Sequence, residues 1–139
     1  MRLGNTTKYA LQALTYLIRS HARDERAQIG DIAADCEIPR KYLEQVLLDL
    51  KSAGLLESKK GQGGGYKLSR SPDQISIGEV LSAIQGDLLP IPDWIDDESS
   101  NFSTDSGLKD VVSHARDSVT RIFEQTSIEV LVCRPETWT

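Results

Sequence analysis

Residues 59–70, read KKGQGGGYKLSR, have the composition in this sequence that most directly suggests chemistry. Four glycines lie among three lysines and an arginine. Glycine lets the backbone approach a neighbouring group closely, and lysine and arginine neutralise phosphates. The stretch could therefore hold the phosphates of a bound nucleotide, or it could be the tip of a β-hairpin that lies against a nucleic acid.

The spacing of the glycines argues against a nucleotide-binding loop. A P-loop closes with lysine followed by serine or threonine and leads into a helix, and this stretch does neither. A dinucleotide fingerprint that starts at Gly61 would need glycine at position 66, which is Tyr66. Residues 55–59 and 65–68 alternate roughly between apolar and polar types, which predicts a two-stranded hairpin around the glycines. A surface turn that contacts nothing is the alternative interpretation.

The elements ahead of this hairpin predict a helix-turn-helix. Ile29, Ile32 and Ala33 have the spacing of a short helix, and Pro39 is suited to the start of a second, longer one. The second helix has one apolar side and ends before Gly54, which suits a helix C-cap. Its first residues are polar, as expected of a recognition helix that enters the major groove.

The first helix is predicted to be capped by Thr6 or Thr7 and to run to about Ser20, followed by a charged loop over residues 21–28. Polar residues interrupt its apolar stretch, so it is neither a signal peptide nor a membrane span. We expect a cytoplasmic protein without a membrane partner. The two cysteines imply no disulfide framework.

The charge is divided unevenly along the 139 residues. Residues 1–70 carry 12 Lys and Arg against 8 Asp and Glu, whereas residues 71–139 carry 4 against 13, so the net charges are +4 and −9. A basic half is the electrostatic signature of a nucleic-acid-binding surface. With two histidines and no Gly-x-Ser-x-Gly elbow, no catalytic constellation emerges, and we do not expect an enzyme.

The acidic half begins with a helix predicted over residues 77–85, capped by Ser76 and closed by Gly86. Prolines and acidic residues then predict irregular structure, and from about Asp105 a long helix follows. Apolar residues repeat along it at steps of four and three, which is typical of a dimerisation seam; packing against the chain's own first helix is the alternative. The predicted interface comprises Leu108, Val112, Ala115, Val119, Ile122 and Phe123.

Several spaced motifs resemble the Rrf-type winged-helix regulators that include IscR, NsrR and CymR. They are Met1-Arg2-Leu3, Lys8-Tyr9-Ala10, Tyr42-Leu43-Glu44-Gln45, Ala53-Gly54-Leu55, Gly61-x-Gly63-Gly64-Gly65-Tyr66 and Ile77-Gly78-Glu79-Val80. The resemblance covers residues 1 to about 90. It implies a dimeric transcription factor that binds an inverted-repeat operator in double-stranded DNA, with a recognition helix in the major groove and a wing in the minor groove.

The resemblance also implies which residues contact DNA. The N-terminal segment would contribute Arg2 and Lys8. The recognition helix would contribute Pro39, Arg40, Lys41, Tyr42, Glu44 and Gln45, and the wing Lys59, Lys60, Gln62, Gly63, Gly64 and Gly65. The chemistry agrees, since cations suit phosphates, glutamate can accept from cytosine and glutamine can pair with adenine. Lys60 and Gln62 stand where the family usually carries arginine and proline, and Glu44 could instead pair with a neighbouring cation.

Cluster-binding members of this family hold an iron–sulfur cluster with three cysteines in the region after the wing, but residues 87–132 of this chain contain none. Cys36 and Cys133 cannot reproduce that site. The chain therefore resembles the branch without cluster cysteines, and we predict no metal site and no cofactor. A regulatory partner protein or a small-molecule effector would then supply the signal.

The sequence thus predicts a mainly α fold with a small β-hairpin. Residues 1–86 would form a winged helix-turn-helix domain, residues 87–104 an acidic loop, and residues 105–139 a dimerisation helix with a C-terminal tail. The predicted function is that of a dimeric, sequence-specific repressor. The alternatives are an iron–sulfur or redox-sensing regulator with atypical ligands, and a protein-interaction adaptor that has lost DNA binding.

Overall fold

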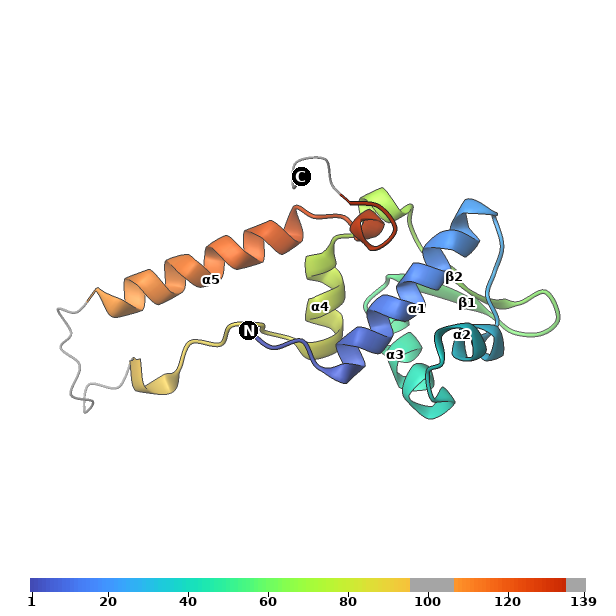
Figure 1. Ribbon diagram of the computed structural model, residues 1–139, viewed down its shortest axis with the longest axis horizontal. Helices are drawn as coiled ribbons and strands as arrows, with labels where there is room; N and C mark the ends of the chain where they lie inside the picture. Colours follow the sequence, from blue (N-terminus) through green and yellow to red (C-terminus); the bar gives the residue numbers. More distant parts are fainter. Residues whose placement is uncertain (96–106, 135–139) are drawn as a thin grey trace.

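The computed structural model describes residues 1–95 and 107–134. Five α-helices and one two-stranded sheet are found in these residues. The first three helices and the hairpin form one body, from which the long last helix extends to the opposite end of the molecule (Figure 1). The mainly α winged-helix fold predicted from the sequence is confirmed. Within the described ranges, no helix combines the length and the apolar character that crossing a bilayer requires.

Helix α1 (Asn5–Ala22) is the central element of the body. Its buried face, which includes Ala10, Leu14 and Leu17, contributes to the core shared with α3 and β2. The prediction that Thr6 or Thr7 caps this helix is wrong, because the N-cap is Gly4 and no side chain caps it. Thr7 lies inside the first turn instead, where it is buried.

Helices α2 (Ile29–Cys36) and α3 (Arg40–Ser52) form the predicted helix-turn-helix. Glu37 adopts a left-handed conformation at the end of α2, and Pro39 is the N-cap of α3. At the other end of α3, Gly54 has a φ of +79°, and the backbone N–H groups of Gly54 and Leu55 donate to carbonyls of the last turn. Ala53 is the C-cap, and Gly54 takes the C′ position after it, as the glycine predicts.

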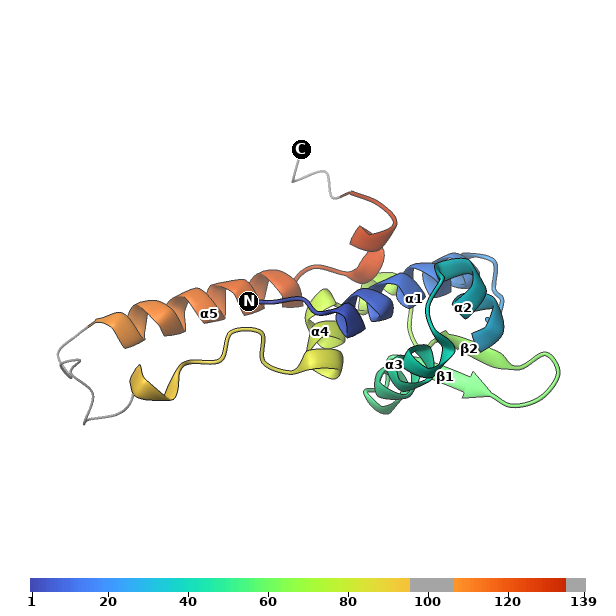
Figure 2. The same cartoon turned by 60° about the horizontal axis from the view of Figure 1, so that its bottom comes forward.

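Strands β1 (Leu56–Lys59) and β2 (Gly65–Leu68) pair antiparallel, with Leu56 opposite Leu68 and Lys59 opposite Gly65. The loop between them projects from the body (Figure 2). A third segment joins this hairpin, because Ala27 and Tyr66 exchange two backbone hydrogen bonds of 2.8 Å. The sequence predicts a loop throughout residues 21–28, but the first of these residues belong to α1. Ala27 pairs with the hairpin just before the first residue of α2.

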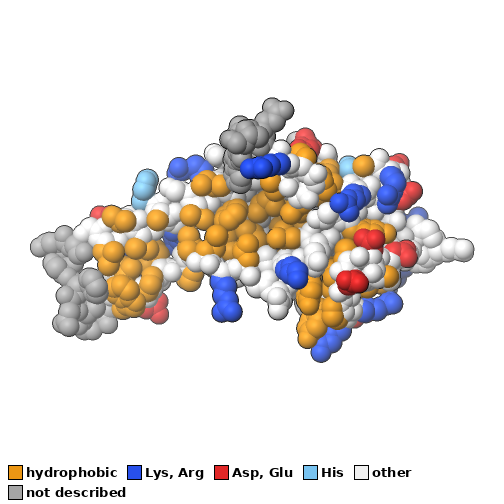
Figure 3. All heavy atoms as spheres, in the orientation of Figure 1, with side chains coloured by type: hydrophobic (Ala, Val, Ile, Leu, Met, Phe, Trp, Pro, Cys, Tyr) orange, Lys and Arg blue, Asp and Glu red, His pale blue; other side chains and the backbone are white. Residues whose placement is uncertain are grey.

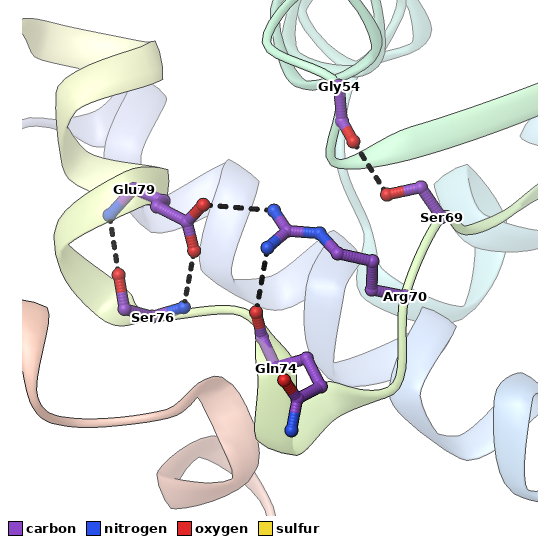
Figure 4. Close-up of polar contacts among 6 residues, drawn as sticks. All are labelled: Gly54, Ser69, Arg70, Gln74, Ser76 and Glu79. Carbon is purple, nitrogen blue, oxygen red and sulfur yellow. Dashed lines mark hydrogen bonds and ion pairs between the residues drawn. The ribbon is translucent and has the colours of Figure 1, made fainter.

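Helix α4 (Ile77–Gln85) has the limits that the sequence predicts. Ser76 and Glu79 form a reciprocal capping box, with Ser76 Oγ accepting from the Glu79 N–H and Glu79 Oε2 accepting from the Ser76 N–H (Figure 4). Arg70, just after β2, donates to Glu79 Oε1 at 2.9 Å and to the Gln74 carbonyl at 2.8 Å. Gln74 ends the short helix η1 (Pro72–Gln74). These bonds tie the end of the hairpin to the start of α4.

Helix α5 (Leu108–Glu124) packs against α4 but has no buried residue. Its C-terminal end approaches α4 closely at Gly78, where an added Cβ would lie 3.1 Å from the Glu124 backbone nitrogen. The segment that follows α4, which contains η2 (Asp93–Ile95), runs beside α5 in both ribbon views (Figures 1 and 2). Residues 96–104 of the predicted acidic loop lie outside the described residues.

The chain returns to the body after α5 through η3 (Ile128–Leu131). Ile128 is fully buried in the core, and its N–H donates to the Ile75 carbonyl at 2.9 Å. The Ile77 N–H donates in turn to the Thr126 backbone carbonyl at 2.8 Å. The division of the chain at residue 86 stays a prediction, to which the structure adds that residues beyond α5 complete the core of the winged-helix body.

Candidate nucleic-acid interface

The first two turns of α3 present a row of exposed polar side chains. Of the residues predicted to contact DNA, all those on this helix and its N-cap are exposed: Pro39, Arg40, Lys41, Tyr42, Glu44 and Gln45. The opposite side of α3 is fully buried and consists of Leu43, Val46, Leu47 and Leu50. The apolar spacing therefore rotates α3 so that its polar start faces away from the core, as a recognition helix requires.

An aromatic pair links the start of α3 to α1. The rings of Tyr9 and Tyr42 stack with centroids 6.0 Å apart, and the Lys41 ammonium lies 5.2 Å from the centre of the Tyr42 ring. Tyr42 nevertheless remains 48% exposed. Stacking and cation–π contacts restrict both side chains before they meet a ligand. The sequence interpretation missed this contact of Tyr9, since only the tertiary fold brings it to Tyr42.

Two contacts on the surface of α3 involve the residues predicted to read bases. Arg40 Nε lies 3.5 Å from Glu44 Oε1, an ion pair in which both side chains are exposed. The Gln45 amide donates to Asp49 Oδ1 at 2.9 Å. Both contacts lie within one exposed helix face, where such pairs contribute little stability. Each must be exchanged for a contact with DNA if these side chains are to pair with bases.

The wing places its cations in two different environments. Lys59, Lys60, Gln62 and Gly63 are exposed in and beside the loop. Lys67, in contrast, pairs across the hairpin with Glu57 at 3.5 Å. The exposed lysines at the tip are therefore the ones placed to meet a phosphate, while Lys67 has a partner within the sheet.

Gly64 and Gly65 are buried, and the structure gives an internal reason for both glycines. A Cβ on Gly65 would lie 2.5 Å from the Ala27 carbonyl oxygen, and φ at this residue is +117°. A Cβ on Gly64 would lie 2.2 Å from the Lys59 carbonyl oxygen. The Gly64 carbonyl also accepts from the Gln28 side chain at 2.8 Å. Gln28, which the sequence interpretation missed, thus fastens the wing to the N-cap of α2.

Arg2 and Lys8 are exposed at the start of the chain and in the first turn of α1. The side-chain stack between Tyr9 and Tyr42 places this end of α1 next to the start of α3. Lys8 therefore lies on the end of α1 that adjoins the recognition helix, whereas Arg2 lies at the C-terminal end of α4, where its carbonyl accepts from Gln85.

The predicted dimer residues lie on α5, which runs from its contact with α4 to the end of the molecule opposite the wing (Figure 1). Leu108, Val112, Val119 and Phe123 are half-buried, whereas Ala115 and Ile122 are exposed. Val111, beside them, is 66% exposed. Hydrophobic side chains gather over α5 and toward α4 on the face shown in Figure 3. Contiguous exposed apolar patches of this kind mark contact sites in soluble proteins.

The cysteines do not fit a three-thiolate cluster site. Cys36 is on α2, half-buried, with its thiol 3.6 Å from the Gln12 carbonyl, and Cys133 is exposed after η3. Burial, aided by the Asp35 carboxylate, raises the pKa of the Cys36 thiol, which disfavours the thiolate that binds metals. Among the residues that the structure describes, no three His, Cys, Asp or Glu side chains are grouped to hold a metal.

Comparison with known proteins agrees with this geometry. The family described as Rrf2, iron-dependent transcriptional regulator, matches residues 3–134. The chain belongs to the Rrf2 family. A Synechocystis protein named as an HTH-type transcriptional regulator, slr0846, is 37% identical over 99 residues, which are 71% of this chain and 67% of that protein.

The HTH-type transcriptional regulator CymR of Bacillus subtilis is 28% identical over 131 residues, which cover 94% of this chain and 89% of CymR. The solved structure of CymR, described as the global cysteine regulator of B. subtilis, superposes with a TM-score of 0.77 at 24% identity. It covers 100% of this chain and 98% of CymR, which confirms the fold. The Rrf2 chain is thus a DNA-binding transcriptional regulator, and its family consists of regulators and not of enzymes.

Proposed function

We propose that this Rrf2 chain is a dimeric repressor that recognises an inverted-repeat operator, with α3 in the major groove and the wing in the minor groove. The observation that carries the proposal is the exposed polar start of α3 beside a wing whose tip carries free lysines. Phosphate contacts from lysine and arginine would fix the position of the protein, and Glu44 and Gln45 would read base edges. A dimer held on a promoter in this way would block transcription.

The apolar surface of α5 supports the dimer. A helix with no buried residue and with Ile122 51% exposed gains stability when a second copy covers its apolar side. Two copies related by a twofold axis would place two recognition helices on successive half-sites, and this arrangement explains an inverted-repeat operator. The predicted seam comprises Leu108, Val112, Ala115, Val119, Ile122 and Phe123.

DNA affinity and its salt dependence test the proposal. Duplexes would be selected from a random-sequence pool with the wild-type chain, and affinity would be measured by fluorescence anisotropy. If the dimer makes roughly 6–10 phosphate contacts, affinity should fall at least a thousandfold between about 50 and 200 mM salt. Lys41→Ala and Lys60→Ala should each weaken binding, whereas Lys51→Ala, in the last turn of α3, is the matched control. A flat salt response, or variants that bind like the wild type, would favour the protein-interaction adaptor.

We further propose that the signal does not pass through a three-cysteine iron–sulfur cluster, although the family is described as iron-dependent. The support is the placement of only two cysteines, one half-buried in α2 and one exposed beyond η3. An anaerobically purified sample should be colourless and free of iron and sulfide. Stoichiometric iron with a visible absorption band would overturn this and favour the alternative regulator with atypical ligands. A partner protein or a small-molecule effector would otherwise provide the signal.

A further inference from the structure

Gln85, the last residue of α4, joins that helix to the start of the chain. Its side-chain Nε2 donates to the Arg2 backbone carbonyl at 2.7 Å, and its Oε1 accepts from the Thr7 hydroxyl. Because a carbonyl can only accept, the amide must point its nitrogen toward Arg2 and its oxygen toward Thr7. One side chain thus holds two points of the N-terminal segment at once.

Of the two segments that Gln85 binds, the one at Thr7 is buried and the one at Arg2 is exposed. Thr7 is only 1% exposed, so its hydroxyl would lose a needed partner if Gln85 moved. Residues 1–4, in contrast, are all exposed and lie before the first turn of α1. Chain ends of this kind are poorly ordered unless something ties them down. In Figure 1 the chain ahead of α1 passes the C-terminal end of α4, where Gln85 holds it.

We infer that Gln85 is a positioning residue for DNA binding, which fixes the Arg2 backbone at the C-terminal end of α4 so that the guanidinium extends from a defined place. The inference rests on the proposed function, and specifically on Arg2 as a phosphate contact. The stack of Tyr9 on Tyr42 places the start of α1 next to the start of α3, and the chain ahead of α1 continues from there past the end of α4 (Figure 1). A segment ordered before binding loses less conformational entropy when it binds.

The test is a double-mutant cycle between Gln85 and Arg2. Gln85→Met keeps the length of the side chain and removes both hydrogen bonds. Because both protomers of the dimer carry the change, affinity for the duplex selected with the wild type should fall about 25-fold to 900-fold, the square of the fivefold to thirtyfold factor for fixing the backbone of one residue. The slope of log affinity against log salt should become shallower by about 1.8, as for two lost phosphate contacts, one from each protomer of the dimer. In an Arg2→Ala background, Gln85→Met should have no further effect.

Two further variants separate positioning from folding. Gln74→Met makes the same substitution at an exposed glutamine whose amide bonds to Asp73, and it should leave affinity and salt slope unchanged. Gln85→Glu keeps the acceptor for Thr7 and removes the donor to Arg2, so it tests the contact if Gln85→Met does not fold. The effect of its added negative charge on DNA affinity is measured with Gln85→Glu in the Arg2→Ala background, and this effect is subtracted.

The outcomes are distinguishable from a failure of the proposed function. A wild-type chain that selects no duplex refutes DNA binding itself. A wild type that binds with the expected salt dependence, together with a Gln85→Met effect that persists in the Arg2→Ala background, overturns only the positioning role. An Arg2→Ala variant with wild-type affinity overturns it as well.

Discussion

Substitution of Gly65 by alanine should destabilise the fold more than the same change elsewhere in the wing. The new methyl group would lie 2.5 Å from the Ala27 carbonyl oxygen, which accepts the Tyr66 N–H. Its φ of +117° is unfavourable for any L side chain and costs about 1–3 kcal/mol. Forcing the methyl group into backbone adds about 1–3 kcal/mol. The free energy of unfolding should therefore fall by about 2–6 kcal/mol.

Two neighbouring glycines separate these contributions. Gly64→Ala introduces only steric clashes, with the carbonyl groups of Lys59 and Gly61, and should cost about 1–3 kcal/mol. Gly63 has a φ of +76° but nothing within 4 Å, so Gly63→Ala should cost only the conformational penalty of about 1–2 kcal/mol. The gain from restricting the unfolded chain is the same in all three variants and cancels in the comparison.

Urea unfolding followed by circular dichroism measures the series. With a slope of about 2 kcal/mol per M, the midpoint of Gly65→Ala should fall by about 1–3 M relative to the wild type. Gly63→Ala should show the smallest shift. If Gly65→Ala and Gly63→Ala unfold at the same midpoint, the close approach of Gly65 to Ala27 does not stabilise the wing and the steric reasoning is refuted.

Tyr9→Leu removes the ring that stacks on Tyr42 and should weaken DNA affinity by about twofold to tenfold, the equivalent of about 0.5–1.5 kcal/mol; unchanged anisotropy titrations would show that the stack positions nothing. Partial burial alone would raise the pKa of Glu79, but its hydrogen bonds and ion pair outweigh burial and lower it. Its contribution to stability is therefore complete above about pH 4.3, the ordinary value for glutamate, and is lost as pH falls through the folded-state pKa. Glu79→Gln should flatten the pH dependence of urea unfolding, and parallel pH profiles for the two proteins would contradict this. Ile122→Lys should convert the dimer to a monomer in sedimentation velocity, while His114→Lys, off the seam, should leave it intact; an equal response from both would exclude the predicted seam.

Local signals predicted much of the fold. Gly54 and Ser76 mark helix ends because the required backbone conformation and the capping bonds involve residues within one or two turns. The apolar spacing of α3 predicted which of its sides faces the core. The threonine cap of α1 was wrong because Thr7 bonds to Gln85, a partner far along the chain. Ala27 and Ile128 went unnoticed for the same reason, since each is defined by a distant pairing.

In the candidate site, too, some residues could be named from the sequence and others could be recognised only in the structure. The exposed residues of α3 could be named from helical periodicity and family motifs, and the structure places them on one surface. Three residues whose contacts support this region, Tyr9, Gln28 and Gln85, could not be assigned those contacts from the sequence, because their partners lie far along the chain. Two of these are glutamines that donate to backbone carbonyls of remote segments, and any exposed glutamine has the same appearance in a sequence.

The burial of Ile128 beneath the winged-helix body has a consequence for the order of folding. Ile75 and Ile128 enclose the whole of α5 between two hydrogen-bonded segments, so the core cannot close until the residues after α5 have left the ribosome. A contact between segments this far apart in sequence forms late, because the intervening chain must first lose the entropy of an open loop. We expect the surface proposed to bind DNA and the helix proposed to form the dimer to become ordered together, so that a nascent chain neither binds DNA nor dimerises before the core closes.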